Sequence, residues 1–168
     1  MSQGGLDMWK LVIFTLSFIV VGSNAATAQT VEWRNGTAVV TSASTACRNN
    51  GINVGSTYDA RYRHPNLGDN PNEARLALIS RRTAHIFGKD GGFTNAFQTA
   101  DFAGFIGGGL VTNNSAQPYQ PQIRMTAQMP GNITATTPQI FMKFIIRRFF
   151  VSPGVNGCTT RLDVSVLK

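Results

Sequence analysis

The side chains in this sequence best suited to proton transfer near neutral pH are its two histidines, His64 and His85. Neither has the spacing to the other, or to an acid, that metal ligands show. General acid–base catalysis also needs a partner within hydrogen-bond reach, and no local spacing supplies one. We therefore expect no metal and no cofactor. The less favoured alternative is that the protein is a secreted hydrolase. This alternative requires one histidine to lie beside an acid in a cleft.

Other catalytic motifs are missing. The chain contains no G-x-S-x-G, the turn that carries the nucleophile of many serine hydrolases. Gly107-Gly108-Gly109 lacks the Lys-Ser/Thr tail of a phosphate-binding loop. The carboxylates are scattered among cations, and no spacing indicates the close pair that a glycosidase needs. The sequence predicts a binding or structural protein rather than an enzyme.

Arginine is the residue type that indicates a ligand. The 168 residues include 15 Lys and Arg against 8 Asp and Glu, a net charge of +7, and eleven of the cations are Arg. Planar guanidinium groups suit carboxylate and phosphate partners, so we expect an anionic glycan or a lipid headgroup, and nucleic acid less. Adjacent arginines in a strand point to opposite faces, so only part of each pair can contribute. The candidate ligand-binding residues are Arg61, Arg63, Arg81, Arg82, Arg148 and Tyr62.

The first 28 residues have the order of a secretory signal peptide. A polar stretch ends at Lys10, an apolar run follows over 11–21, and small residues up to Ala28 offer two cleavage sites. The run is shorter than the about 20 residues of a spanning helix. We expect residues 29–168 to form one exported domain, periplasmic or extracellular, with no transmembrane anchor after cleavage. An uncleaved anchor is the alternative.

The two cysteines, Cys47 and Cys158, are expected to pair with each other behind such an export signal. The bridge closes a loop of about 110 residues, which the chain-entropy model values at roughly 4 to 5 kcal/mol. Neither cysteine has a CxxC neighbour, so a redox or metal role is not indicated.

The last thirty residues are predicted to form the centre of the fold. The segments 139–152 and 158–167 flank a turn containing Pro153 and Gly157, which predicts a central β-hairpin. Eight of the fourteen residues in the first segment are β-branched or aromatic, which favours a strand. A cationic amphipathic helix with Lys143, Arg147 and Arg148 on one face is the rival, and it would imply a membrane-active protein. The length of the strand predicts a bulge near Arg147.

Further strands are predicted from alternation over 56–63 and 123–129, and Pro130-Gly131-Asn132 predicts a turn that joins the second of these to a strand over 133–137 as a hairpin. Asn35-Gly36 between β-prone residues predicts a type I′ hairpin over 30–41, anchored on the core by Trp33. The segment 74–87 is ambiguous between one long strand and a helix. We expect an all-β domain, a β-sandwich or a partly closed barrel of about seven to nine antiparallel strands.

The function that follows is an exported, non-catalytic binding or structural module of an envelope or the extracellular space, with arginines holding an anionic ligand. The main alternative is a small β-barrel that carries a hydrophobic ligand. It predicts an apolar cavity lined by Phe93, Phe97, Phe102 and Phe105.

Overall fold

A computed structural model of the chain describes residues 33–65, 67, 72–106, 108–112, 120–149 and 157–168. This part consists of antiparallel strands and one short helix, α1 (Thr45–Arg48), so the all-β prediction is confirmed. None of its helices is long and apolar enough to cross a membrane. The predicted signal peptide, and residues 150–156 of the predicted central turn, lie outside the described residues.

The described strands form a single continuous sheet in the order β5-β8-β9-β10-β1-β2-β3-β4-β6-β7, and every neighbouring pair is antiparallel. One sheet, rather than two packed sheets, therefore provides both walls of the core. The strands are β1 (Arg34–Ala43), β2 (Thr57–Arg63), β3 (Glu73–Ile79), β4 (Thr83–Asp90), β5 (Gln98–Thr99), β6 (Asp101–Ile106), β7 (Gly109–Thr112), β8 (Gln122–Met129), β9 (Gln139–Phe149) and β10 (Cys158–Leu167).

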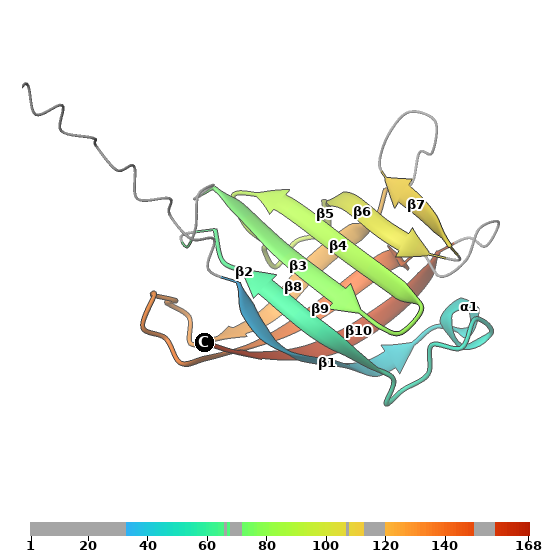
Figure 1. Cartoon of the computed structure of the whole chain (residues 1–168), viewed down its shortest axis with the longest axis horizontal. Helices are drawn as coiled ribbons and strands as arrows, with labels where there is room; N and C mark the ends of the chain where they lie inside the picture. Colours follow the sequence, from blue (N-terminus) through green and yellow to red (C-terminus); the bar gives the residue numbers. More distant parts are fainter. Residues whose placement is uncertain (1–32, 66, 68–71, 107, 113–119, 150–156) are drawn as a thin grey trace, which may run out of the picture.

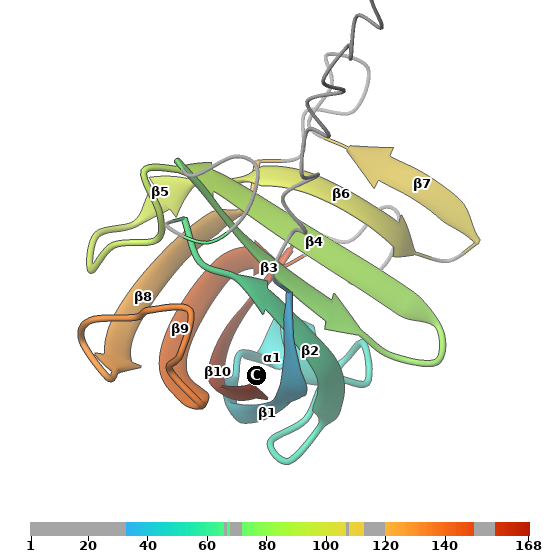
Figure 2. The same cartoon turned by 60° about the vertical axis from the view of Figure 1, so that its left-hand side comes forward.

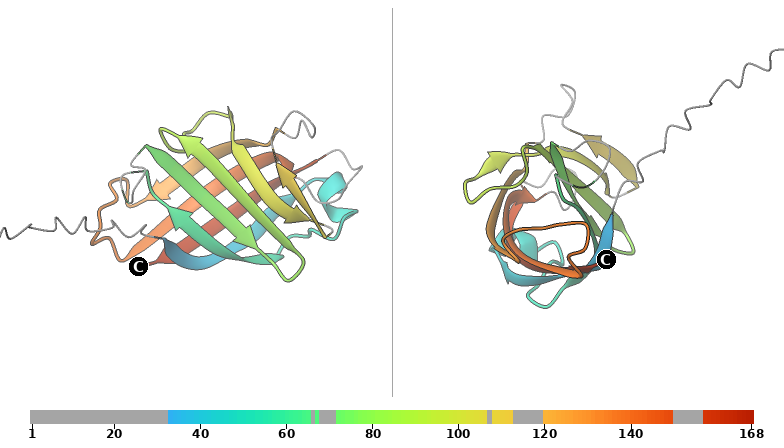
Figure 3. Two further views of the ribbon diagram at one scale, coloured as in Figure 1. Left: turned by 45° about the horizontal axis from the view of Figure 1, so that its top comes forward. Right: turned by 90° about the vertical axis from the view of Figure 1, so that its left-hand side faces the viewer.

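The sheet curls into a half-barrel, with β3, β4 and β6 facing β8, β9 and β10 across the interior (Figures 1 and 2). The end-on view in Figure 3 shows the curl around a central axis. β5 pairs with β8 and β6 pairs with β4, although only Ala100 separates β5 from β6 in the chain. The Ala100 N–H also donates to the Pro121 carbonyl (3.0 Å). One short segment therefore contacts both sides of the curled sheet.

The central hairpin is present as β9 and β10, and it excludes the helical interpretation of 139–149. Along β9 the residues Ile140, Met142, Phe144 and Ile146 point into the interior and are buried. The register with β10 shifts between Cys158 and Thr160, and Arg148 has φ 54°. The bulge expected near Arg147 is therefore confirmed. It explains why Phe149, three residues after Ile146, is also buried.

The interior is filled by alternate residues from all the long strands, as a sheet with one face buried requires. β10 contributes every second residue from Cys158 to Val166, and β2 contributes Tyr58, Ala60 and Tyr62. The largest fully buried side chains are Arg34, Tyr62, Phe87, Phe144, Phe149, Leu76, Leu78, Ile106, Ile123, Ile140, Met142 and Ile146.

The predicted disulfide between Cys47 and Cys158 is present, with a sequence separation of 111. Its first cysteine lies in α1. The bond holds α1 against the start of β10, at the end of the half-barrel opposite the C-terminus (Figure 1).

The predicted hairpin at Asn35-Gly36 is wrong. Both residues lie inside β1, where Gly36 pairs with Val166 of β10 and with Ala60 of β2. A Cβ at Gly36 would collide with the backbone of Ser165 and Val166. Glycine is needed here for the close approach of two strands and not for a turn. Trp33 is only half-buried, so it does not anchor the core.

Two further predictions are corrected. The segment 74–87 is neither one strand nor a helix: β3 and β4 pair with each other, and the chain turns at Ser80–Arg82. In that turn the Ser80 N–H donates to the Thr83 carbonyl (2.8 Å). Residues 133–137 form no strand. The buried guanidinium of Arg34 instead donates to the carbonyls of Thr134 (3.0 Å), Ala135 (3.3 Å) and Thr137, and so fixes this loop over one end of the interior.

Removal of the disulfide tests how far it stabilises the fold. We expect the Cys47→Ser/Cys158→Ser double variant to lose about 4 to 5 kcal/mol of unfolding free energy, because the loop entropy of the unfolded chain is no longer restricted. Urea titration followed by tryptophan fluorescence measures the change. A loss below about 1 kcal/mol would show that the other interactions hold the two ends together without it.

Candidate functional site

The six residues predicted to bind a ligand do not share one surface. The Tyr62 side chain points into the interior and is 1% exposed, and Arg63 is also buried. Arg61 is exposed on the outer face of β2, opposite Asn35, which pairs with Leu167 at the far end of β10. Arg148 is exposed beside Phe149, which pairs with Cys158 at the start of β10. The length of β10, about 30 Å at 3.4 Å per residue, separates these two arginines along the sheet.

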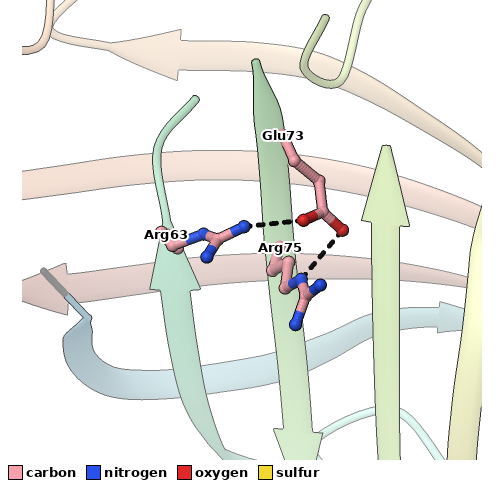
Figure 4. Close-up of polar contacts among 3 residues, drawn as sticks. All are labelled: Arg63, Glu73 and Arg75. Carbon is pink, nitrogen blue, oxygen red and sulfur yellow. Dashed lines mark hydrogen bonds and ion pairs between the residues drawn. The ribbon is translucent and has the colours of Figure 1, made fainter. Parts of the chain in front are cut away.

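Arg63 belongs to an ion-pair cluster with Glu73 and Arg75 (Figure 4). Its Nη2 lies 2.7 Å from one Glu73 oxygen, and the Arg75 Nε lies 2.8 Å from the other. Burial alone would raise the pKa of Glu73, but the hydrogen bonds and charges of the two arginines outweigh it and hold the pKa below its usual value. The cluster joins β2 to β3, and the Arg63 guanidinium is committed to it.

A second group of cations lies on the outer face of β8, β9 and β10. Arg124 pairs with Ile145, and Ile145 pairs with Arg161, so the two arginines stand in one row across three strands. Lys143 lies two residues before Ile145 on the same face, with its Nζ 3.7 Å from Asp163. These residues line a hollow of 430 Å³ in which Asp163 is the one acid.

Arg147 extends this group along β9. Its Cζ lies 3.7 Å from the centroid of the Phe97 ring, and the Arg124 Cζ lies 5.7 Å from the same centroid. The Arg124 Nε also donates to Asn95 (3.0 Å). The ring and the amide hold both guanidinium groups in place without neutralising them. We refer to Arg124, Lys143, Arg147 and Arg161 as the basic face.

Sequence reasoning missed the basic face, although it predicted the strands that form it. Period 2 in the sequence puts Arg124 and Arg161 on the face of their strands opposite the apolar residues. Only the register between β8, β9 and β10 shows that the cations are neighbours, and register is set by pairing over long separations. Adjacent arginines were chosen instead because they are conspicuous in the sequence.

His85 lies inside the half-barrel among aromatic rings. The Phe149 ring centroid is 4.4 Å from that of the imidazole, and Phe87, Phe102 and Tyr58 surround it at 6.1 to 6.4 Å. The residue is 1% exposed, and its Nδ1 has no hydrogen-bond partner among the described residues. Burial lowers the pKa of His85 to about 4, so the ring is neutral at pH 7.

A pocket of 340 Å³ adjoins His85 at the disulfide end of the half-barrel. The loop after α1 contributes Asn50, Gly51 and Ile52 to its wall, the start of β2 contributes Ser56, Thr57 and Tyr58, and the β3–β4 turn contributes Ser80, Arg82 and Thr83. Its lining among the described residues contains no carboxylate. A neighbouring hollow of 660 Å³ shares Thr57, Tyr58, Ser80 and Arg82, and Arg81 and Asp59 also line it.

The residues named for the other hypotheses are dispersed. His64 is half-buried beside Tyr62, and burial followed by the charge of Arg34 lowers its pKa. Phe93 packs against Phe144, while Phe102 points inward and Phe105, three residues on, is 54% exposed on the outer face. Phe97 lies under Arg147. The four phenylalanines proposed for a lipid cavity therefore do not line a common space.

Comparison with known proteins adds no identity: no family model, no curated protein and no solved structure matches this chain. The site must therefore be interpreted from its own geometry.

Substitution of Glu73 tests the role of the ion-pair cluster. We expect Glu73→Gln to lower the unfolding free energy by about 3 kcal/mol, because the charge of Arg63 stays buried with no carboxylate to balance it. Thermal and urea denaturation measure the loss. In the Arg63→Met/Glu73→Gln double variant no such charge remains, and most of the stability should return. An equally unstable double variant would contradict this account.

The buried neutral imidazole predicts a pH dependence of stability. Above pH 6.5 His85 is neutral in both states, whereas between pH 6.5 and about 4 only the unfolded state binds the proton. Stability should therefore fall by about 3 kcal/mol as the pH drops through this window. Urea titrations at several pH values measure how the unfolding free energy changes with pH. The His85→Phe variant keeps the aromatic packing but has no imidazole, so it should not show the part of the fall that His85 causes. Parallel slopes in the two proteins would show that other groups cause the fall.

Proposed function

We propose that the chain is an exported, non-catalytic module that binds an anionic polysaccharide through the basic face. The observation that carries the proposal is the placement of Arg124, Lys143 and Arg161 on three neighbouring strands around one hollow that contains a single acid. Neighbouring strands are about 4.8 Å apart, so Arg124 and Arg161 start from backbones about 10 Å apart. Cations in such a row suit a ligand with repeated negative charges better than a single ion.

The shape of this surface favours a glycan over a membrane. Lipid binding uses exposed apolar side chains that enter the bilayer interface. Two of the most exposed large hydrophobic side chains among the described residues, Phe105 and Leu110, lie on β6 and β7, and Met129 lies at the end of β8, opposite Phe141 of β9. Phe97 is half-buried beneath Arg147. A polar chain laid across the strands meets guanidinium groups, which the Phe97 ring holds in place from below.

Export and the lack of catalysis are part of the same proposal. The disulfide and the N-terminal sequence pattern support an oxidising compartment, periplasmic or extracellular. A binding role is supported at His85 as well, because aromatic rings surround it and no carboxylate lines the pocket beside it to orient it for proton transfer.

Paired substitutions test the basic face. We expect Arg124→Gln/Lys143→Gln to weaken binding of the full chain to heparin or polygalacturonate by at least about tenfold. By the counterion-release argument, the slope of log affinity against log salt should also fall by about 1 to 2. Affinity chromatography and calorimetry at several salt concentrations measure both effects.

The matched control removes the same charge elsewhere. Arg61→Gln/Arg81→Gln takes two cations from the residues first indicated by the sequence and should change the affinity less than about twofold. If both double variants lose the same affinity for the polysaccharide, net charge alone explains the binding, and the basic face is not the site. Binding to phosphatidylglycerol vesicles but to neither polysaccharide would assign the face to lipid headgroups instead.

A further inference from the structure

A second site lies at the other wall of the half-barrel, in the pocket beside His85. It shares no residue with the basic face, so it stands or falls separately from the proposed function. The strongest observation is the Nδ1 of His85, a buried polar atom without a partner among the described residues. Buried polar atoms are nearly always hydrogen-bonded, and an exception calls for a physical reason such as a bound molecule.

The imidazole is held by its surroundings. Phe149 lies against it with ring planes 30° apart and centroids 4.4 Å apart, and Phe87 lies parallel within 5° on the same strand. A neutral imidazole offers one donor and one acceptor nitrogen. His85 also lines the pocket, so a hydroxyl group held there would lie next to a ring whose polar atoms its aromatic neighbours cannot satisfy fully.

The pocket wall has the groups that a hydroxylated molecule needs. Ser56, Thr57, Ser80 and Thr83 bring hydroxyl groups to it. Ser80 and Thr83 are already ordered by their mutual contact (2.8 Å), and the Asn50 amide is oriented by its bond to the Ala46 carbonyl (2.8 Å). Burial raises the pKa of Tyr58 to about 12, so its phenol stays protonated as a donor. Ile52 and the Tyr58 ring supply apolar surface.

Arg82 sets the charge of the ligand. It is exposed in the β3–β4 turn, and its guanidinium makes no hydrogen bond or ion pair with the described residues. Among the described residues no carboxylate lines this pocket, although Asp59 lines the neighbouring hollow that shares Arg82. A volume of 340 Å³ is at the small end of the about 300 to 1,000 Å³ usual for ligand pockets. That size suits a single sugar ring and not an extended chain.

We propose that this pocket binds one hydroxylated acid of the size of a uronic acid, with its carboxylate on Arg82 and a hydroxyl group beside the imidazole of His85. The ligand would lie between the loop after α1 and the β3–β4 turn. Because the Cys47–Cys158 disulfide fixes α1, it would also hold one wall of the site in place.

Titration of the isotope-labelled full chain with three probes tests the proposal. Glucuronate carries both features, methyl glucoside only the hydroxyl groups and propionate only the acid. We expect glucuronate to shift the ring-nitrogen resonances of His85 and the amide resonances of Ser80 and Thr83 saturably, and to bind at least tenfold more tightly than either partial probe. No saturable shift at these residues would overturn the proposal, as would equal affinities for glucuronate and propionate.

Variants locate the contacts. Arg82→Gln, at an exposed turn, and His85→Phe, which keeps the aromatic packing, should each weaken glucuronate binding at least tenfold, while Arg61→Gln should leave it within twofold. Circular dichroism shows whether His85→Phe is folded. If His85→Phe is not folded, the affinity of the Arg82→Gln variant for glucuronate still tests the proposal. Glucuronate binding that survives Arg82→Gln unchanged would overturn the assignment.

Discussion

Pairing between β1 and β10, the first and last strands of the described chain, is the constraint on which the rest of the structure depends. It places the β9–β10 hairpin inside the strand order, with β8 and β5 on one side and β1 to β4, β6 and β7 on the other. The disulfide from α1 reinforces this pairing at one end. At the other end Arg34, the first residue of β1, fixes the loop before β9. The two strands thus connect parts of the chain more than one hundred residues apart.

Alternation in the sequence predicted which residues face the interior wherever a strand had one buried face. Tyr58, Ala60 and Tyr62 share the buried face of β2, and every second residue from Cys158 shares the buried face of β10, because period 2 is a property of the strand itself. The bulge in β9 was also predictable, since its length and its two adjacent arginines made unbroken pairing unfavourable. The disulfide followed from there being only two cysteines.

Features that depend on pairing partners were not predictable from the sequence alone. Asn35-Gly36 has the composition of a tight turn, yet pairing with β10 and β2 on both sides outweighs the local preference. The turn between β3 and β4 falls at Arg81 and Arg82, residues with weak turn preference, because the buried faces of the two strands fix their register. Arg63 appeared available for a ligand because nothing in the sequence showed that Glu73 would meet it.

The two candidate sites lie on different faces of the one sheet. A curled sheet buries its inner face, so cations on the outer face of β8 to β10 stay in solvent and can gather only where strand register aligns them. The inner face must be apolar except where it reaches an end of the half-barrel. His85 occupies such a place, near the turn after β3, where a polar group can face a pocket while its ring remains part of the aromatic core. An extended anionic chain therefore suits the outer face, whereas a single small acid suits the end.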